Sequence, residues 1–349
     1  MSKSLNVALL GNPNTGKTSV FNQLTGLNQK VGNYPGITVE KKEGVCKLNH
    51  TSKAHVLDLP GTYSLNASSM DESVVIELLL NKNNKDFPDV AVVVTDIENL
   101  KRNLLLFTQV KDLEIPTLLV INMADQMKRK GITIDIESLE KELDTKISLI
   151  STRDNDGFSE LKALILNYRQ LSTKSTISLA SIDDDYFKRL EKAFPTQSVY
   201  KLWLVITQDV NFAKIDRNRF HDDTNFKIQS DSDLKRLQQK ETVKRYQFIN
   251  NSLKTTLKVD RNSATDLRSR LDRVLIHKFW GYVIFFGILM TIFQSIFEWA
   301  SFPMDLKGSC QKNIETWSNM GLLGRRSLFL RWGVSRKRWK NTLCVPVAR

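Results

Sequence analysis

Short apolar runs alternate with stretches of helical spacing over the first 168 residues of the chain. The runs lie at residues 5–10, 55–57, 90–94, 117–121 and 147–150. This alternation predicts an α/β fold, a doubly wound and mostly parallel sheet with helices on both faces. Ligands bind such a sheet at the carboxyl ends of its strands, so functional residues are expected there.

The pattern changes after residue 170, where strand-like runs end. A Ser/Thr-rich stretch at 171–181 reads as a linker, and residues 182–265 show helical spacing that Pro195 interrupts. This spacing predicts a small all-α domain over 182–265. The positions that form its main apolar face are Leu234, Leu237, Tyr246, Ile249, Leu253 and Leu257.

A third pattern begins at residue 279, because residues 279–297 carry no charge. A helix of that length approaches the thickness of a bilayer core, so we predict one transmembrane helix over 279–300, with a buried core helix as the alternative. Trp280, Tyr282 and Trp299 lie at its ends. The basic juxtamembrane segment 266–278 favours a cytoplasmic first domain, and no signal peptide is expected.

The chain's net charge of +13 is distributed unevenly. Residues 307–349 hold ten of the 51 Lys and Arg but one acidic residue, Glu315. The basic tail over 301–349 therefore says little about what the first 300 residues bind. Three scattered cysteines fit a reducing cytoplasm, and the four histidines show no metal-ligand spacing.

The sequence GNPNTGKTS directly follows the first apolar run and precedes a helical stretch. In the pattern GxxxxGK(S/T), backbone amides surround phosphates, Lys17 reaches the β- and γ-phosphates, and the Thr18 hydroxyl faces Mg²⁺. We therefore expect a phosphate-binding loop. Its residues are Gly11, Asn12, Pro13, Asn14, Thr15, Gly16, Lys17, Thr18 and Ser19.

Two further motifs also follow apolar runs. In DLPG, Asp58 is expected to hold Mg²⁺ through water, and the Gly61 amide to approach a γ-phosphate. In NMAD, Asn122 and Asp125 have the NxxD spacing of guanine recognition, since a carboxylate accepts both N1–H and N2–H of guanine. Ser151, Thr152 and Arg153 are placed to offer a backbone contact to guanine O6. Together these motifs predict a Ras-like P-loop GTPase domain over 1–170.

The stretch VGNYPGITVE at 31–40, with GNPNTGKTS and DLPGTYSL, resembles the G domain of the FeoB family of bacterial ferrous iron transport proteins. The resemblance covers roughly residues 1–306 and includes segments at 200–203, 207–212 and 234–251, with charged pairs at 272–273 and 277–278. It implies that 182–265 is a spacer that modulates GDP release and couples the G domain to the membrane. A packing appendage is the alternative.

The resemblance also implies roles for particular residues. Gly36 is expected among the nucleotide-binding residues, and Thr38 matches the Thr that coordinates Mg²⁺ and senses the γ-phosphate. Asn14 matches the Asn that ligates K⁺ in potassium-activated relatives, and the carbonyls of Gly32 and Tyr34 complete that K⁺ site. Thr62 stands where Ras-like enzymes carry a water-orienting Gln.

From this we expect slow GTP hydrolysis stimulated by K⁺. The residues expected to act in catalysis are Asn14, Lys17, Thr38 and Gly61.

The leading interpretation is the GTPase part of a Fe²⁺ transporter in the cytoplasmic membrane of a bacterium. Its cofactors are GTP, Mg²⁺ and K⁺, and its partners are lipid, small adaptor proteins and further copies of itself, without nucleic acid. Nothing after residue 306 resembles the family, so we expect a truncated or frameshifted chain that lacks most of the pore. The alternatives are an RNA- or ribosome-associated GTPase and a non-hydrolysing, membrane-anchored GTP switch.

Overall fold

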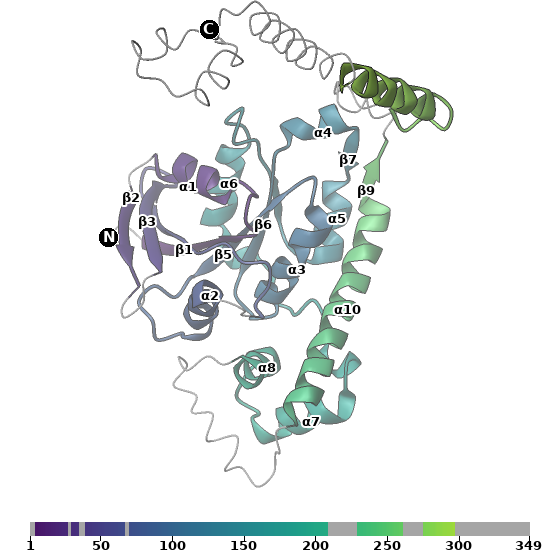
Figure 1. Ribbon diagram of the computed structural model, residues 1–349. Coiled ribbons are helices and arrows are strands. Elements are labelled where there is room, and N and C mark those ends of the chain that lie inside the picture. Colours follow the sequence, from purple (N-terminus) through teal and green to yellow (C-terminus); the bar gives the residue numbers. More distant parts are fainter. Residues whose placement is uncertain are drawn as a thin grey trace, which may run out of the picture. The chain divides into compact units, whose positions relative to one another are not determined.

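The computed structural model describes residues 4–26, 29–34, 39–66, 70–208, 229–260 and 275–296. These residues belong to two compact units, Met1–Asp266 and Leu267–Arg349, and each is described by itself. Figure 1 shows the first unit as a sheet with helices on both faces, continued by further helices.

Seven strands form the main sheet. They are β1 (Ser4–Gly11), β2 (Gln29–Asn33), β3 (Glu40–Lys47), β4 (Lys53–Asp58), β5 (Val90–Asp96), β6 (Thr117–Asn122) and β8 (Ile147–Leu149). Their order is β2-β3-β4-β1-β5-β6-β8. The pairs from β4 to β8 are parallel, whereas β2 and β3 extend one edge in antiparallel pairs. The predicted mostly parallel sheet is confirmed.

Helices cover both faces of this sheet (Figure 1). One face carries α1 (Lys17–Thr25) and α6 (Phe158–Leu166), and the other carries α2 (Met70–Leu80), α3 (Leu100–Lys111) and α5 (Ile136–Leu143). Side chains alternate between the faces of a strand. In β5, for example, Val92 packs on the α1 side and Val93 on the α3 side. Burial on both faces explains why β5 is apolar almost throughout.

The segment after the sheet is helical and shares its core. Its elements are η1 (Tyr168–Gln170), η2 (Leu179–Ser181), α7 (Asp184–Ala193), α8 (Val199–Thr207) and α10 (Asp231–Thr256). Trp203 of α8 and Ile249 of α10 belong to the same hydrophobic cluster as the α3 side of the sheet. Of the predicted apolar face, four positions on α10 are buried and Tyr246 is partly buried, whereas Leu257, also partly buried, lies just after the end of α10. The predicted domain bounds stay predictions.

Three charged side chains are buried within this shared core and contact one another. Arg245 of α10 is 0% exposed; its Nε donates to Glu241 Oε1 at 2.8 Å, and its Nη1 lies 2.8 Å from Asp112 Oδ2 at the end of α3. Trp203 Nε1 donates to Glu241 Oε2 at 2.8 Å. Asp112 Oδ1 also accepts from the Thr176 hydroxyl at 2.7 Å. This buried ionic cluster joins α3, the linker, α8 and α10.

A second, two-stranded sheet closes the unit. After α4 (Asp125–Lys130), β7 (Ile132–Ile134) pairs antiparallel with β9 (Leu257–Val259), which follows α10 directly. The Asp260 amide then donates to Gly131 O at 2.8 Å. The prediction that 182–265 is all-α is wrong at β9, because the backbone groups of β7 offer these residues hydrogen-bond partners.

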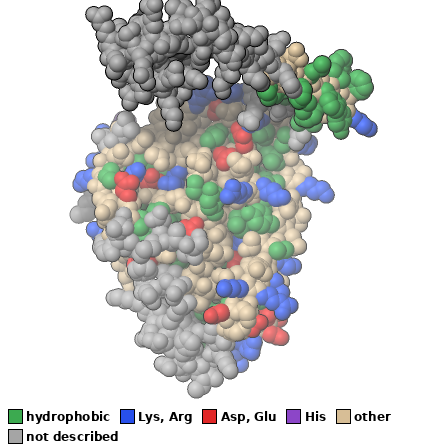
Figure 2. Space-filling model, viewed as in Figure 1, with side chains coloured by type: hydrophobic (Ala, Val, Ile, Leu, Met, Phe, Trp, Pro, Cys, Tyr) green, Lys and Arg blue, Asp and Glu red, His purple; other side chains and the backbone are tan. Residues whose placement is uncertain are grey.

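The second unit is described over residues 275–296, of which 280–296 are helical. Large apolar side chains are exposed there, Ile276 at 78% and Met290 at 72% among them, and Figure 2 shows hydrophobic side chains gathered on this helix. Within the ranges that the structure describes, no helix combines the length and apolar character needed to cross a bilayer. The transmembrane helix over 279–300 stays a prediction. Residues 266–274 of the juxtamembrane segment, 297–300 and the tail over 301–349 lie outside the described residues.

Candidate functional site

The loop between β1 and α1 contains backbone in the left-handed region. Gly16 has φ +82°, and a Cβ added there would lie 2.3 Å from Asn122 Nδ2, so a side chain is excluded. Asn14 also has a positive φ, 67°, and its side chain is exposed. The Thr15 hydroxyl donates to Asn12 O at 2.9 Å and closes the turn. The loop therefore holds its conformation through glycine and internal hydrogen bonds.

Lys17 and Asp58 form an ion pair at the end of β4. The side chains of Lys17 and Asp58 are 11% and 5% exposed, so little water screens the two charges. Burial lowers the pKa of Lys17 more than the Asp58 carboxylate raises it, and the charge of Lys42 lowers it further. The pair brings the predicted phosphate-binding cation beside the predicted Mg²⁺ anchor.

The segment after Asp58 contacts the phosphate-binding loop. The Thr62 amide donates to Gly11 O at 3.2 Å, and a Cβ on Gly61 would lie 3.3 Å from Pro13 Cγ. Glycine therefore permits the close approach at position 61. The Thr62 hydroxyl donates to Ser64 O at 2.7 Å and to Glu72 Oε1 at 3.0 Å.

Asn122 ends β6 fully buried, with its amide bonded on both sides. Its Nδ2 donates to Thr15 O at 3.0 Å, and its Oδ1 accepts from the Thr152 amide at 3.2 Å. The Asp125 carboxylate accepts from the Ser151 hydroxyl at 3.2 Å and lies 3.9 Å from Arg153 Nη1. The predicted guanine-recognition residues are thus brought together, and Asn122 ties them to the phosphate-binding loop.

Gly32 and Tyr34, whose carbonyls are predicted to complete the K⁺ site, lie in β2 and directly after it. Gly32 is exposed in β2, and the Tyr34 amide donates to Val39 O at 3.0 Å. Tyr34 is 9% exposed, and burial raises the pKa of its phenol. Gly36 and Thr38 lie outside the described residues, so their predicted roles stay predictions.

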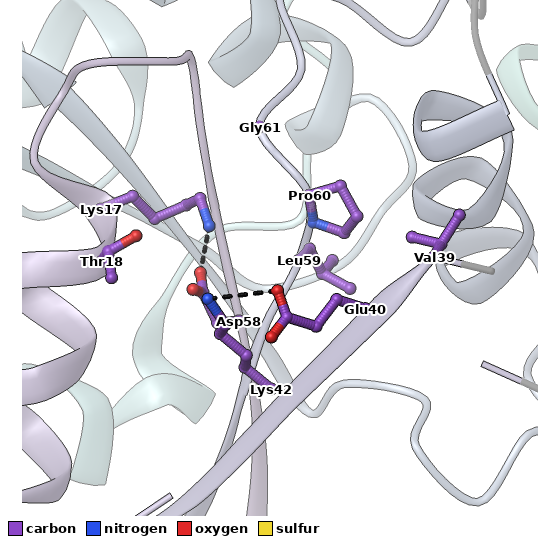
Figure 3. A pocket seen from close by; sticks show the side chains of 9 residues that line it. All are labelled: Lys17, Thr18, Val39, Glu40, Lys42, Asp58, Leu59, Pro60 and Gly61. Carbon is purple, nitrogen blue, oxygen red and sulfur yellow. Dashed lines mark hydrogen bonds and ion pairs between the residues drawn. The ribbon is translucent and has the colours of Figure 1, made fainter. Parts of the chain in front are cut away.

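A pocket opens over the Lys17–Asp58 pair, and Figure 3 shows the side chains around it. The lining residues are Lys17, Thr18, Val39, Glu40, Lys42, Asp58, Leu59, Pro60 and Gly61. Glu40 and Lys42 are not among the sequence-predicted site residues. In β3, residues 40 and 42 share one face, but charges on both faces of the strand left no signal for which face lines a site.

The oxygen atoms of the pocket suit a hard divalent cation. The Thr18 hydroxyl and the Asp58 carboxylate line the same cavity, and Mg²⁺ prefers one or two such ligands together with phosphate oxygens and water. Elsewhere, the described part of the chain contains no group of three His, Cys, Asp or Glu side chains arranged for a metal. The donor set therefore fits Mg²⁺ bound beside a phosphate.

Comparisons with known proteins agree with this geometry. The profile of a family described as "Ferrous iron transport protein B" matches residues 5–165. The Fe(2+) transporter FeoB of Leptospira biflexa is 34% identical over 318 residues, which are 87% of this chain and 45% of the relative. The chain thus spans less than half the length of this relative.

Solved structures extend the likeness to the helical segment. The cytosolic domain of T. maritima FeoB in a GDP form is 29% identical, with a TM-score of 0.65, over 74% of this chain and 100% of that one. The cytosolic domain of L. pneumophila FeoB is 30% identical, with a TM-score of 0.59, over 73% of this chain and 100% of that one. The chain therefore belongs to the FeoB family of ferrous iron transport proteins and contains that family's P-loop GTPase domain.

Proposed function

We propose that the chain binds GTP and hydrolyses it to GDP and phosphate with Mg²⁺, as the cytoplasmic GTPase part of a ferrous iron transporter. The observation that carries the proposal is the convergence of Lys17, Asp58, Asn122 and Asp125 from separate segments at one edge of the sheet. The T. maritima relatives solved in GDP and GMPPNP forms support a guanine nucleotide as the ligand.

Each group at the site has a chemical task in this proposal. The amides of residues 11–18 and the ammonium of Lys17 bind the phosphates. Thr18, Thr38 and Asp58 hold Mg²⁺, Asp58 through water, and the ion neutralises phosphate charge when bound. The Gly61 amide senses the γ-phosphate. Asp125 accepts from guanine N1–H and N2–H, and the backbone of residues 151–153 faces O6.

Potassium supplies the remaining positive charge in the proposal. Asn14 and the carbonyls of Gly32 and Tyr34 would hold K⁺ next to the phosphates, where its charge would stabilise the transition state. The Thr62 hydroxyl, bonded to Ser64 and Glu72, does not orient the attacking water. Hydrolysis is therefore slow without K⁺.

Attachment to the cytoplasmic membrane of a bacterium is part of the same proposal. A helix that is apolar all round is typical of a segment buried in protein or in a bilayer, and residues 280–296 expose large apolar side chains. Ferrous iron is the cargo that the names of the longer relatives indicate.

The test is GTP turnover by the full chain in KCl and in NaCl. We expect turnover to be about tenfold or more faster in KCl, and Asn14→Ala to remove the difference. Asn83→Ala, in an exposed turn, serves as the control and keeps it. Equal rates in both salts would contradict the K⁺ site. Tight GTP binding without turnover in either salt would replace the enzyme with a non-hydrolysing switch.

A further inference from the structure

Strand β3 presents different charged pairs on its two faces. Lys41 lies 2.7 Å from Asp86 and 3.2 Å from Glu43, on one face. Glu40 and Lys42 lie on the other face, where Lys42 Nζ is 3.4 Å from Glu40 Oε2 and both side chains line the phosphate pocket. The second pair therefore faces the proposed Mg²⁺ site, and Figure 3 shows it beside Asp58.

The register of the sheet places Lys42 directly opposite Asp58. Lys42 and Asp58 are cross-strand partners in the antiparallel β3–β4 pair, and such partners have Cβ atoms about 4.5–5.5 Å apart. The charge of Lys42 also reaches Lys17, whose pKa it lowers. Asp58 thus has two lysines as neighbours, Lys17 in contact and Lys42 on the adjacent strand.

Lys17 and Lys42 differ in whether they change partners when nucleotide binds. In the proposed function Lys17 leaves Asp58 for the phosphates, which frees the carboxylate for the hydration shell of Mg²⁺. Lys42 stays on its strand, where the released Asp58 is its cross-strand partner. An ammonium paired with Asp58 would compete with a divalent cation for the same oxygen atoms.

We propose that Glu40 is a positioning residue for Mg²⁺: by pairing with Lys42 it keeps that ammonium off Asp58. This inference rests on the proposed function, because it concerns the metal of the same site. Neither residue needs to contact the ion. The Glu40–Lys42 pair sets the concentration of free Mg²⁺ at which the site is half-saturated.

The test measures the release of mant-GDP from the full chain as a function of free Mg²⁺. Glu40→Gln removes the charge that holds Lys42, so we expect the half-saturating Mg²⁺ concentration to rise about tenfold, equivalent to about 1.4 kcal/mol. Lys42→Met in the Glu40→Gln background removes the competitor, and the double variant returns to within about twofold of the wild type. Glu43→Gln, which breaks a pair on the opposite face, is the matched control and leaves the value unchanged.

Two outcomes would overturn the inference. One is an unchanged Mg²⁺ requirement in Glu40→Gln; the other is a double variant that behaves like Glu40→Gln alone. Thermal unfolding of each variant separates these results from misfolding. A wild-type chain that releases mant-GDP independently of Mg²⁺, or does not bind it, would instead refute the proposed function.

Discussion

Asn122 and Asp125 belong to one motif but do different work. The Asn122 amide bonds protein backbone on both sides, at Thr15 and Thr152, and is fully buried. The Asp125 side chain is 12% exposed and has hydroxyl, amide and guanidinium neighbours. At the residue scale, the first is a structural clamp, and the second, which reads guanine in the proposed function, is bonded by neighbouring side chains.

Substitutions should therefore separate stability from specificity. Asn122→Ala leaves buried backbone groups without partners, which costs about 1–3 kcal/mol, so both the melting temperature and GDP affinity should fall. Asp125→Asn should leave melting unchanged and shift preference from mant-GDP towards mant-XDP, because an amide donates to the xanthine O2. Thermal melts and titrations with both nucleotides check this. A melting temperature unchanged in Asn122→Ala would refute the clamp.

Two glycines at helix ends offer a comparison at the element scale. Gly157 precedes α6 with φ +81°, and a Cβ there would lie 2.3 Å from Leu149 O. Gly26 follows α1 with φ +63° and has nothing within 4 Å of that position. Gly26→Ala should cost about 1 kcal/mol for the left-handed backbone alone, and Gly157→Ala more than twice that. Urea unfolding of both variants measures the difference, and equal losses would contradict the steric argument.

The buried ionic cluster makes α10 dependent on α3. Arg245→Met leaves Asp112 and Glu241 buried without their cation and should lower the free energy of unfolding by about 3–5 kcal/mol. The triple variant Asp112→Asn, Glu241→Gln, Arg245→Met removes the stranded charges and should recover part of the loss. Lys188→Met, in an exposed pair with Asp184, is the control and should change nothing measurable. An Arg245→Met variant as stable as the wild type would refute the role of the cluster.

Some elements could be predicted from the sequence and others could not. The strands that are buried on both faces appear in the sequence as apolar runs; they are β1, β4, β5, β6 and β8. Because these runs mark the strand ends, the motifs that follow β1, β4, β6 and β8 could be assigned to one edge of the sheet. β3, with the sequence EKKEGVCK, carries charges on both faces because it lies near the sheet edge, so Glu40 and Lys42 were missed. β9 pairs with a strand more than 120 residues earlier in the chain, and no local sequence pattern predicts this pairing.

The buried charges of α10 show a different limit. Glu241 and Arg245 continue the spacing of four that runs from Leu237 to Ile249. Charges within an apolar stripe were therefore visible in the sequence. Their partner Asp112 lies in another element, and only the tertiary arrangement supplies it.

The whole first unit should unfold as one body. The sheet and the helical segment share one hydrophobic cluster, and residues 1–266 contain a single tryptophan, Trp203, which is 0% exposed in α8. In a fragment of residues 1–266, GDP at 100 times its Kd should stabilise the fold by about 2.7 kcal/mol. Trp203 fluorescence and far-UV circular dichroism should then shift together. Two separate transitions, with GDP moving one of them, would contradict a shared core.

The β7–β9 pair also decides how the unit responds to force. The chain leaves β9 at Asp260, which is bonded to Gly131, the residue that joins α4 to β7. Tension applied beyond residue 260 pulls the adjacent ends of two antiparallel strands apart, so it loads their hydrogen bonds one at a time, as in opening a zipper, rather than all at once in shear. A pull at that point therefore opens the β7–β9 pair from the end beside α4, the helix that begins at Asp125.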